Sequence, residues 1–364
     1  MFFINNFFDF ATKEISHSAF WAWVLNSVDK RGGYNIPSKL GVNFLKTILF
    51  KKAKDYNEID KVSVTTEYCP PGSTKKIDIF VEVNETINIV IENKLNAIPS
   101  KEQLNKYYEI FGSNTLFVFV NLGYDYDFNV PEPWLKFTIE DILNLFEGIN
   151  IKKHFLIKEY YNWLYSRNKY FLDLESGIFS PNLNKVERSL STMEGQWKFF
   201  NSLFDNFFGQ YYKGYNNDGS CQTQFWFFNL PQDHEMKEQY PYALFYRVDK
   251  YRRKGYYLSL RQYLHIPTYI KNKNLKEPQV KSRKKEDLKK LRFIWQTSVK
   301  KINFELKAYR PNNRGVFESE IGCFIIDDVN HPSKLRTVIP NLHNEFLCQL
   351  RNEGWPIEIG NEGV

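Results

Sequence analysis

Two spacings of apolar residues alternate along the first half of the chain. Apolar positions recur at helical spacing from about residue 12, where Thr12 is a suitable N-cap, and again from Gly41. Elsewhere in this half, apolar and polar residues alternate with a period of two or form short apolar runs, which predicts strands. The predicted strands cover 62–68, 76–83, 87–94 and 115–123, and two further helices cover 100–112 and 138–149. Two helices, a hairpin and a strand–helix–strand crossover in this order indicate an α/β layer with a mixed sheet.

Beyond residue 150 the pattern predicts a second, α+β unit. A helical pattern at 154–171 leads into a stretch rich in turn-forming residues, 173–185, which we take as the domain boundary. The predicted elements that follow are a long helix at 186–212, strands at 223–231, 242–250, 255–265, 302–310 and 317–327, a basic helix before the last two strands, and a final helix at 332–354. We therefore expect one domain at 1–180 and an α+β domain at 186–364.

The apolar runs at 76–83 and 87–94 form a predicted hairpin whose register can be written down. If residues 84–86 close the turn, the numbers of facing residues sum to 170, so Asp78 lies opposite Glu92. Side chains alternate along a strand, which places Lys94 on the same face. The other face carries only isoleucine and valine, at positions 77, 79, 81, 83, 87, 89 and 91. Such a face is expected where a helix covers the sheet.

Asp78, Glu92 and Lys94 therefore meet at one end of a buried hairpin. Two carboxylates this close repel when ionised, so they share a proton or hold a cation. Mg²⁺ fits, because it takes oxygen ligands and is commonly held by one or two carboxylates. The lysine would orient an attacking water and stabilise developing charge. The triplet alone leaves open a plain alternative, an ion-paired strand end at the rim of the sheet.

The stretch resembles the PD-(D/E)XK nuclease superfamily, in which an acidic residue on one strand is followed by (D/E)xK on the next. Here the pattern reads Asp78, then Glu92-Asn93-Lys94, with Ile77 in place of the usual proline. The resemblance implies a restriction-endonuclease-like core, a central mixed β-sheet flanked by helices. It also implies that Asp78, Glu92 and the carbonyl of Asn93 hold Mg²⁺, for which Mn²⁺ substitutes.

Flanking residues extend the resemblance over about 10–150. Gln103 and Tyr107 resemble the QxxxY element of the RecB-type branch, and Glu14 occupies a place where the family often has a further carboxylate facing the metal. The first helix, KEISHSAFWAWVLNS, also resembles the opening helix of a bacterial branch of the superfamily.

Each flanking residue also has a structural explanation. Ser100 and Gln103 form a capping box regardless of catalysis, Tyr107 suits a half-buried position, and Glu14 suits the first turn of a helix. His17 fits an ordinary packed histidine, and Glu67 ends the strand before the hairpin, where it would point towards the same site.

Composition and charge narrow the function classes. The 364 residues carry a net charge of +7, which favours an anionic partner, and the four cysteines form no CxxC pair that would indicate zinc or a disulfide framework. No apolar stretch approaches the roughly 20 residues of a membrane span, and no signal peptide is recognisable, so we expect a cytoplasmic protein without a membrane partner. The candidate contacts to nucleic acid are Lys75, Lys76, Arg252, Arg253, Lys284 and Lys285. For the last four, a solvated helix face or core packing explains the pattern equally well.

The sequence thus predicts a Mg²⁺-dependent nuclease that hydrolyses phosphodiester bonds, with DNA as the substrate and defence against foreign DNA as the setting. Two other functions stay open: a non-catalytic nucleic-acid-binding module on a nuclease-like scaffold, and a nuclease gated by a ligand or protein that binds the second domain. For residues 186–364, target binding, homodimerisation and sensing all remain open.

Overall fold

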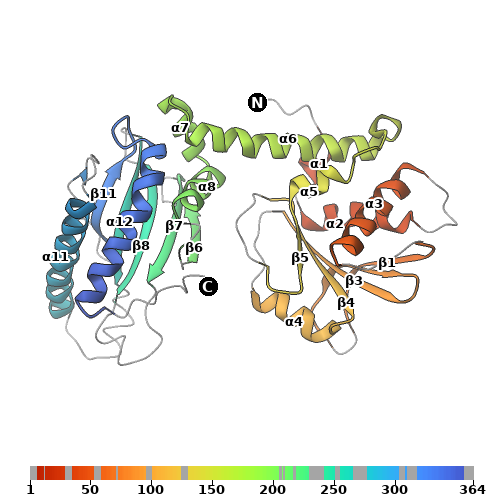
Figure 1. Cartoon of the computed structure of the whole chain (residues 1–364), viewed down its shortest axis with the longest axis horizontal. Helices are drawn as coiled ribbons and strands as arrows, with labels where there is room; N and C mark the ends of the chain where they lie inside the picture. Colours follow the sequence, from red (N-terminus) through yellow and green to blue (C-terminus); the bar gives the residue numbers. More distant parts are fainter. Residues whose placement is uncertain are drawn as a thin grey trace. The chain divides into compact units, whose positions relative to one another are not determined.

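The computed structural model describes residues 6–11, 13–28, 35–52, 59–70, 73–95, 101–123, 130–204, 207, 210–215, 219–228, 242–250, 255–264, 277–302, 308–309 and 318–355. The chain divides into two compact units, Met1–Leu172 and Asp173–Val364. Each unit contains one sheet, and each is described separately below (Figure 1). Among the described residues, no helix has the length and apolar character to cross a membrane.

The sheet of the first unit is mixed, as the order of elements predicts. Its strands are β1 (Val62–Tyr68), β2 (Ile77–Val83), β3 (Ile87–Lys94), β4 (Thr115–Asn121) and β5 (Leu135–Phe137), and they lie in this order across the sheet. The pairs β1–β2 and β2–β3 are antiparallel, whereas β3–β4 and β4–β5 are parallel. The short edge strand β5 has no counterpart in the sequence prediction.

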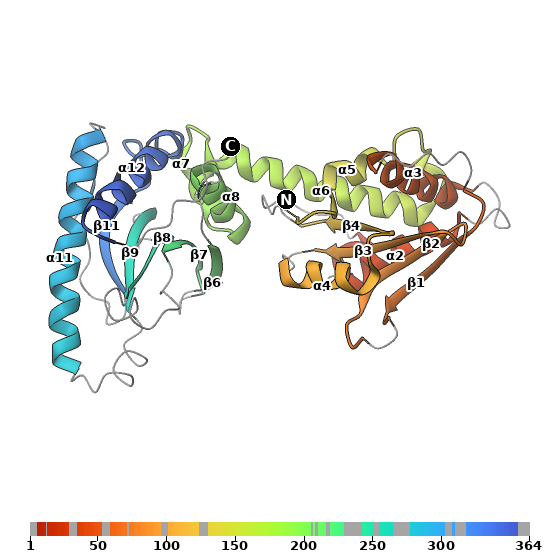
Figure 2. The same ribbon diagram turned by 60° about the horizontal axis from the view of Figure 1, so that its bottom comes forward.

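Helices cover both faces of this sheet (Figures 1 and 2). Their bounds are α1 (Phe7–Phe10), α2 (Glu14–Asn26), α3 (Ile36–Lys51), α4 (Lys101–Phe111), α5 (Ile139–Asn144), the 3₁₀ helix η2 (Ile151–Lys153) and α6 (Phe155–Ile178). The larger core packs α2, α3 and α6 against one face, and a smaller core beneath α4 covers the other. This is the restriction-endonuclease-like arrangement expected from the sequence.

The helix α3 begins five residues before the predicted start at Gly41. Asn35 caps it, since its side-chain oxygen accepts a hydrogen bond from the amide of Ser38 at 2.9 Å, and Pro37 occupies the first turn. An asparagine cap and a proline in the first turn are common at the start of a helix. The prediction used only the spacing of apolar residues and therefore placed the start too late.

The predicted hairpin register is confirmed from Ile79, which faces Ile91, to Val83, which faces Ile87. Asn84 and Glu85 turn the chain with positive φ angles of 52° and 60°. Asparagine adopts this region with less strain than most residues. Its side-chain oxygen also accepts hydrogen bonds from the amides of Asp60 and Lys61, at 2.9 and 3.0 Å, which ties the turn to the start of β1.

The predicted single apolar face is wrong at Ile77. The predicted isoleucines and valines from Ile79 to Ile91 pack under α2 and α3, but Ile77 packs in the core beneath α4. The ladder between β1 and β2 skips Glu67, whose φ is +49°, and β3 pairs with β2 only as far as Ile79. Strand β2 therefore departs from regular alternation of its side chains immediately before the predicted site.

The second unit has an antiparallel sheet with helices on one face. The strands are β6 (Gln210–Tyr215), β7 (Cys221–Phe228), β8 (Tyr242–Lys250), β9 (Tyr256–Leu264), β10 (Ala308–Tyr309) and β11 (Glu318–Ile325), in the order β10-β11-β9-β8-β7-β6. The helices are α7 (Leu183–Leu190), α8 (Met193–Phe204), α11 (Glu277–Ile302) and α12 (Pro332–Asn352). The core lies between the sheet and α8, α11 and α12.

Two predictions for this region are wrong. Residues 173–178 belong to α6 rather than to a loop, because Leu174 and Ile178 are buried on its face. The long helix at 186–212 is α7, α8 and the start of β6. The break follows Ser191, and Thr192 begins the next helix by accepting a hydrogen bond from the Gly195 amide at 3.0 Å.

Candidate active site

The site lies where β2 and β3 separate. The regular ladder ends at Ile79 opposite Ile91, and one residue further on the Asp78 carboxylate accepts a hydrogen bond from the Asn93 amide at 2.7 Å. The ladder does not include the predicted pair of Asp78 and Glu92, but Asp78 is close enough for its charge to raise the pKa of Glu92, which is 2% exposed. A half-buried and a buried carboxylate therefore lie at the end of an otherwise apolar hairpin.

Lys94 binds two carboxylates. Its ammonium lies 2.7 Å from Oε1 of Glu92 and 3.2 Å from Oε2 of Glu14. Glu14 is the first residue of α2, and its other oxygen accepts a hydrogen bond from the amide of Leu95 at 3.3 Å. The structure thus brings Glu14 into the site, in contact with the lysine and the end of β3.

Gln103 and Tyr107 reach the same carboxylate from α4. The amide nitrogen of Gln103 donates to Oε1 of Glu92 at 3.0 Å and to the Tyr107 hydroxyl at 3.2 Å. The Tyr107 hydroxyl in turn donates to the carbonyl of Lys76 at 2.8 Å, just before β2. The two α4 residues therefore brace Glu92, while the assignment to a RecB-type element stays a prediction.

Asn93 ties β3 to α2 through its side chain. It is fully buried, and its amide nitrogen lies 3.3 Å from the Ser18 hydroxyl and 3.5 Å from the carbonyl of Glu14. Ser18 was not among the residues predicted for the site. Its spacing of four residues from Glu14, which places both on one helix face, was the available signal.

Burial dominates the electrostatics of the site. It raises the pKa of Glu92 to about 7, and the neighbouring Asp78 charge adds to this effect. Burial also raises the pKa of Asp78, against the opposing influence of Lys94 and of the Asn93 amide. For Lys94, burial lowers the pKa, but the pairing with Glu92 and the nearby Asp78 and Glu14 outweighs it. At neutral pH the lysine is therefore a cation.

The residues present fit a hard cation. Oε2 of Glu92 is buried and has no hydrogen-bond partner among the described residues, which is costly unless a ligand satisfies it. The donors at hand are oxygens of Asp78, Glu92 and the Asn93 backbone, the ligand type that Mg²⁺ prefers. Within the described part of the chain, no group of three or more His, Cys, Asp or Glu side chains has metal-binding spacing. The fit therefore rests on two carboxylates and a backbone carbonyl.

The other candidates lie in different environments. His17 is buried with its ring 4.5 Å from that of Trp163, and burial lowers its pKa to about 4, as for a packed core histidine. Glu67 lies 3.8 Å from the Lys76 ammonium. Lys75 and Lys285 are exposed, whereas Lys284 is buried, which speaks against a contact to phosphate. Four predicted positions, Thr12, Ser100, Arg252 and Arg253, lie outside the described residues.

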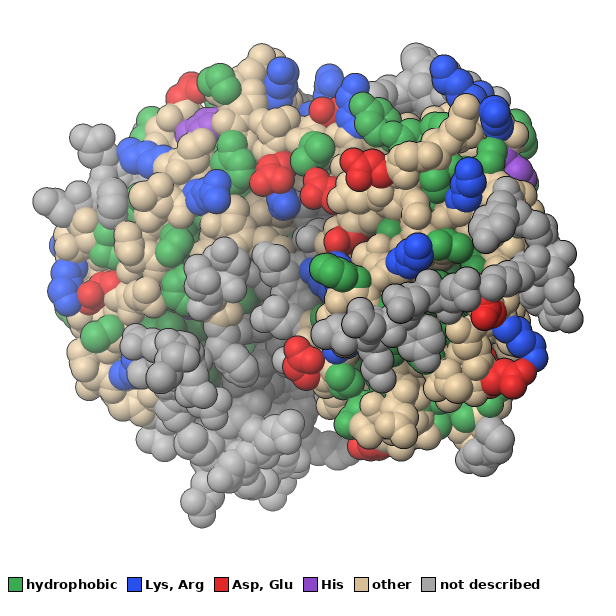
Figure 3. Space-filling model, turned by 45° about the vertical axis from the view of Figure 1, so that its right-hand side comes forward, with side chains coloured by type: hydrophobic (Ala, Val, Ile, Leu, Met, Phe, Trp, Pro, Cys, Tyr) green, Lys and Arg blue, Asp and Glu red, His purple; other side chains and the backbone are tan. Residues whose placement is uncertain are grey.

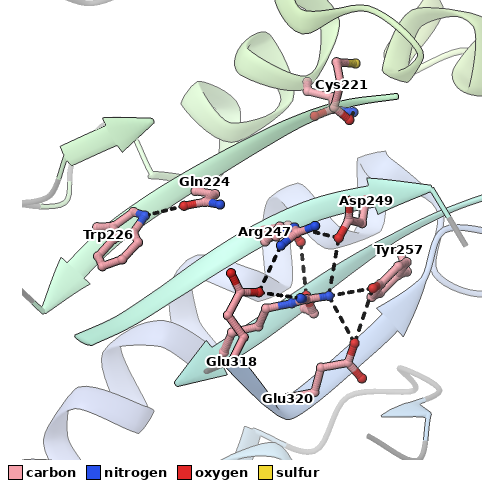
Figure 4. Close-up of polar contacts among 11 residues, drawn as sticks. Cys221, Gln224, Trp226, Arg247, Asp249, Tyr257, Glu318 and Glu320 are labelled. Atoms are coloured by element: carbon pink, nitrogen blue, oxygen red, sulfur yellow. Dashed lines mark hydrogen bonds and ion pairs between the residues drawn. The ribbon is translucent and has the colours of Figure 1, made fainter. Parts of the chain in front are cut away.

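A second group of charged side chains lies on the sheet of the second unit (Figure 4). Two arginines, Arg247 of β8 and Arg261 of β9, lie among three carboxylates. The carboxylates are Asp249, Glu318 and Glu320. Arg261 lies 2.8 Å from Glu318 and 3.1 Å from Glu320, and Arg247 lies 2.6 Å from Asp249. Because these charges satisfy one another, the group is a cross-strand ion network that ties β8, β9 and β11 together.

Comparison with known protein families identifies the first unit. Residues 5–162 match the family model described as the PD-(D/E)XK nuclease superfamily. No curated protein and no solved structure matches the chain significantly. The matched segment contains the whole candidate site, from Glu14 to Tyr107, and ends before the second unit.

Proposed function

We propose that this protein is a metal-dependent nuclease that hydrolyses phosphodiester bonds of DNA, because residues 5–162 match the family model of the PD-(D/E)XK nuclease superfamily. The observation that carries the proposal is the environment of Glu92. A buried carboxylate next to a second carboxylate and 2.7 Å from a lysine, with one oxygen unpartnered among the described residues, is expensive to maintain. A cation and a phosphate substrate would satisfy these groups.

Asp78, Glu92 and the carbonyl of Asn93 would hold Mg²⁺, or Mn²⁺ in its place. The bound ion would supply Lewis-acid polarisation and neutralise charge on the phosphate. Lys94, which remains protonated, orients the water that attacks phosphorus and stabilises the negative charge of the transition state. Glu14 holds the ammonium from α2, and Gln103 holds Oε1 of Glu92 from α4. These two side chains keep the reactive groups in place before the substrate binds.

Exposed lysines would bind the DNA backbone. Lys75 and Lys76 precede Asp78 by three and two residues and are open to solvent, so phosphates near the site lie within their reach. In the second unit, Lys285, Lys289 and Lys290 lie on the exposed face of α11. On the face drawn in Figure 3, Lys and Arg side chains are interspersed with acidic and apolar ones.

Defence against foreign DNA is the setting we assign by family analogy, with the second unit as a DNA-binding element. A homodimer and a regulatory partner for this unit would each add to the scheme without changing the site.

Incubation with supercoiled plasmid, linear DNA and RNA, in Mg²⁺, Mn²⁺ or EDTA, tests the proposal. We expect cleavage of DNA that requires the cation and falls at least about 100-fold in Asp78→Asn and Lys94→Met. Glu82→Gln, on the same strand β2, is the matched control and should cleave normally.

Cleavage that survives both site substitutions would refute the site assignment. Metal-independent DNA binding without cleavage would instead identify a binding module. Activity that appears only when a cell extract is added would indicate a gated nuclease.

A further inference from the structure

An arginine outside the proposed catalytic set holds the ends of β3 and β4. Arg167 lies in α6, and its Nε donates to the carbonyl of Leu122 at 2.7 Å, while a terminal nitrogen donates to the carbonyl of Leu95 at 3.1 Å. Leu95 directly follows Lys94, and Leu122 follows Asn121, the partner of Lys94 in the parallel ladder. One guanidinium therefore joins the two strand ends next to the candidate site.

The backbone around Lys94 is held from several directions. The amide of Leu95 donates to Oε1 of Glu14 at 3.3 Å, and the carbonyl of Lys94 accepts a hydrogen bond from the amide of Leu122 at 2.8 Å. With the bonds from Arg167, the peptide units after Lys94 are fixed by α2, β4 and α6. The lysine side chain leaves the chain where these three elements meet.

Arg167 is itself held in position. Its guanidinium lies 5.5 Å from the ring centre of Trp163, one turn earlier on α6, and 5.2 Å from that of Phe171, one turn later. The two carbonyls that it binds belong to Leu95 and Leu122, which are 4% and 0% exposed. A planar fork of donors between two rings can satisfy two buried carbonyls at once, which a lysine in this place cannot do equally well.

We propose that Arg167 is a positioning residue for Lys94. It fixes the end of β3 and so directs the ammonium towards the reacting phosphate, without touching substrate or cation. The expected effect on catalysis rests on the proposed nuclease function. A displacement of about 1 Å in a catalytic group can lower the rate about 100-fold. A merely structural tie between α6 and the sheet would stabilise the unit but would leave the lysine where it is.

The variant Arg167→Met keeps the aliphatic stem between the rings and removes the donors. Arg336→Met is the matched control, since Arg336 also stacks on a ring, that of Phe179 at 5.3 Å, but lies in the second unit. The first measurement needs no substrate. Hydrogen exchange at the amides of Leu95 and Leu122, and reductive methylation of Lys94 followed by mass spectrometry, should each be about tenfold faster in Arg167→Met and unchanged in Arg336→Met.

The second measurement separates positioning from structure. Arg167→Met should lower kcat about 100-fold, while KM for DNA and the Mn²⁺ dissociation constant stay within about twofold, because Asp78 and Glu92 are untouched. Arg167→Lys, which keeps the charge and part of the bonding, should recover a share of kcat and of the slow methylation. It also serves as the folded comparison if the methionine variant is unstable.

Unchanged exchange and methylation in both Arg167 variants would overturn the inference, as would a loss of Mn²⁺ binding in parallel with activity. If the wild-type protein cleaves no nucleic acid, with or without a cell extract, the nuclease proposal fails on that result alone. The methylation rate of Lys94 still decides whether Arg167 positions this side chain.

Discussion

Glu92 binds its neighbours through one of its two oxygens. Oε1 accepts from both Lys94 and Gln103, at 2.7 and 3.0 Å, and leaves Oε2 buried with no hydrogen-bond partner among the described residues. Two donors on the same oxygen fix the rotation of the carboxylate, so the other oxygen points consistently in one direction. A carboxylate held in this way is prepared for a ligand before that ligand arrives.

Gln103→Met tests this arrangement, since it keeps the length of the side chain and removes the donor. We expect Mn²⁺ binding, measured by calorimetry, to weaken about tenfold or more, as for other groups that orient a metal ligand. Tyr107→Phe is the matched comparison, because it removes a partner of Gln103 but leaves the bond from Gln103 to Glu92. Its effect on Mn²⁺ should be the smaller of the two. Equal losses in both variants would contradict a specific role for Gln103.

A buried histidine in the second unit gives a pH dependence of stability. His343 is 1% exposed among the rings of Phe204, Phe207, Phe225, Phe227 and Tyr246, and burial lowers its pKa to about 3. In the unfolded chain this histidine takes up a proton near pH 6.5, whereas in the folded chain it does not. Its contribution to the free energy of unfolding is therefore fully present above pH 6.5 and is lost as the pH falls. At pH 5 this loss is about 2 kcal/mol.

His343→Phe removes the proton-binding group and keeps a ring in the aromatic cluster. Urea unfolding at pH 7.5 and at pH 5 should therefore show a smaller acid loss in the variant, by about 2 kcal/mol. His17, whose pKa is also lowered by burial, is present in both proteins and cancels in the comparison. Parallel pH dependence in the two proteins would show that His343 is already protonated, or reaches solvent, at pH 5.

At the scale of elements, the sequence predicted best where two signals agreed. Alternation and a three-residue break both set the register of β2 and β3, and the structure has that register from Ile79 to Val83. The departure at Ile77 could not be predicted, because the alternation within β2 does not indicate that its regular pairing with β3 ends at Ile79. The contacts of Arg167 were equally inaccessible, since they join segments 45 and 72 residues apart without a local pattern. Glu14 and Gln103, by contrast, were identified only through family resemblance.

Gly123 permits the close approach of β3 and β4 at their ends. A Cβ atom added to this glycine would collide with the carbonyl of Leu95, a backbone group that also accepts a hydrogen bond from Arg167. Gly123→Ala should therefore push the strand ends apart beside Lys94. We expect a loss of about 1–3 kcal/mol in unfolding free energy, together with a lower kcat.

Gly214→Ala is a suitable comparison, because the added methyl group would meet only the side chain of Gln222, at 3.5 Å. Thermal unfolding and cleavage rates of the two variants supply the test. A Gly123→Ala protein with normal stability and rate would mean that the strand ends are less tightly packed than the structure indicates.

At the scale of the whole molecule, the site and the exposed lysines of α11 belong to different units. The proposed catalytic residues lie in Met1–Leu172, whereas α11 carries Lys285, Lys289 and Lys290 on its exposed side in Asp173–Val364. Among them Phe293 is 70% exposed, a ring that a solvated helix face does not need. If the second unit holds DNA, its contribution should be electrostatic, separable from catalysis and independent of the cation.

Replacing Lys285, Lys289 and Lys290 by glutamine tests this division of roles. Each phosphate contact releases counterions, so the slope of log K against log salt for a DNA duplex should fall by about 0.9 for each lysine that binds phosphate, about 3 in all. Fluorescence anisotropy in EDTA measures this without cleavage. The matched control replaces Lys152 and Lys153, two exposed lysines of η2, and should leave the slope as it is.

Cleavage at saturating protein should stay near the wild-type rate in the α11 variant, because the residues around Glu92 are unchanged. An unaltered slope would exclude α11 from the DNA interface and leave the basic residues near Asp78 as the contact.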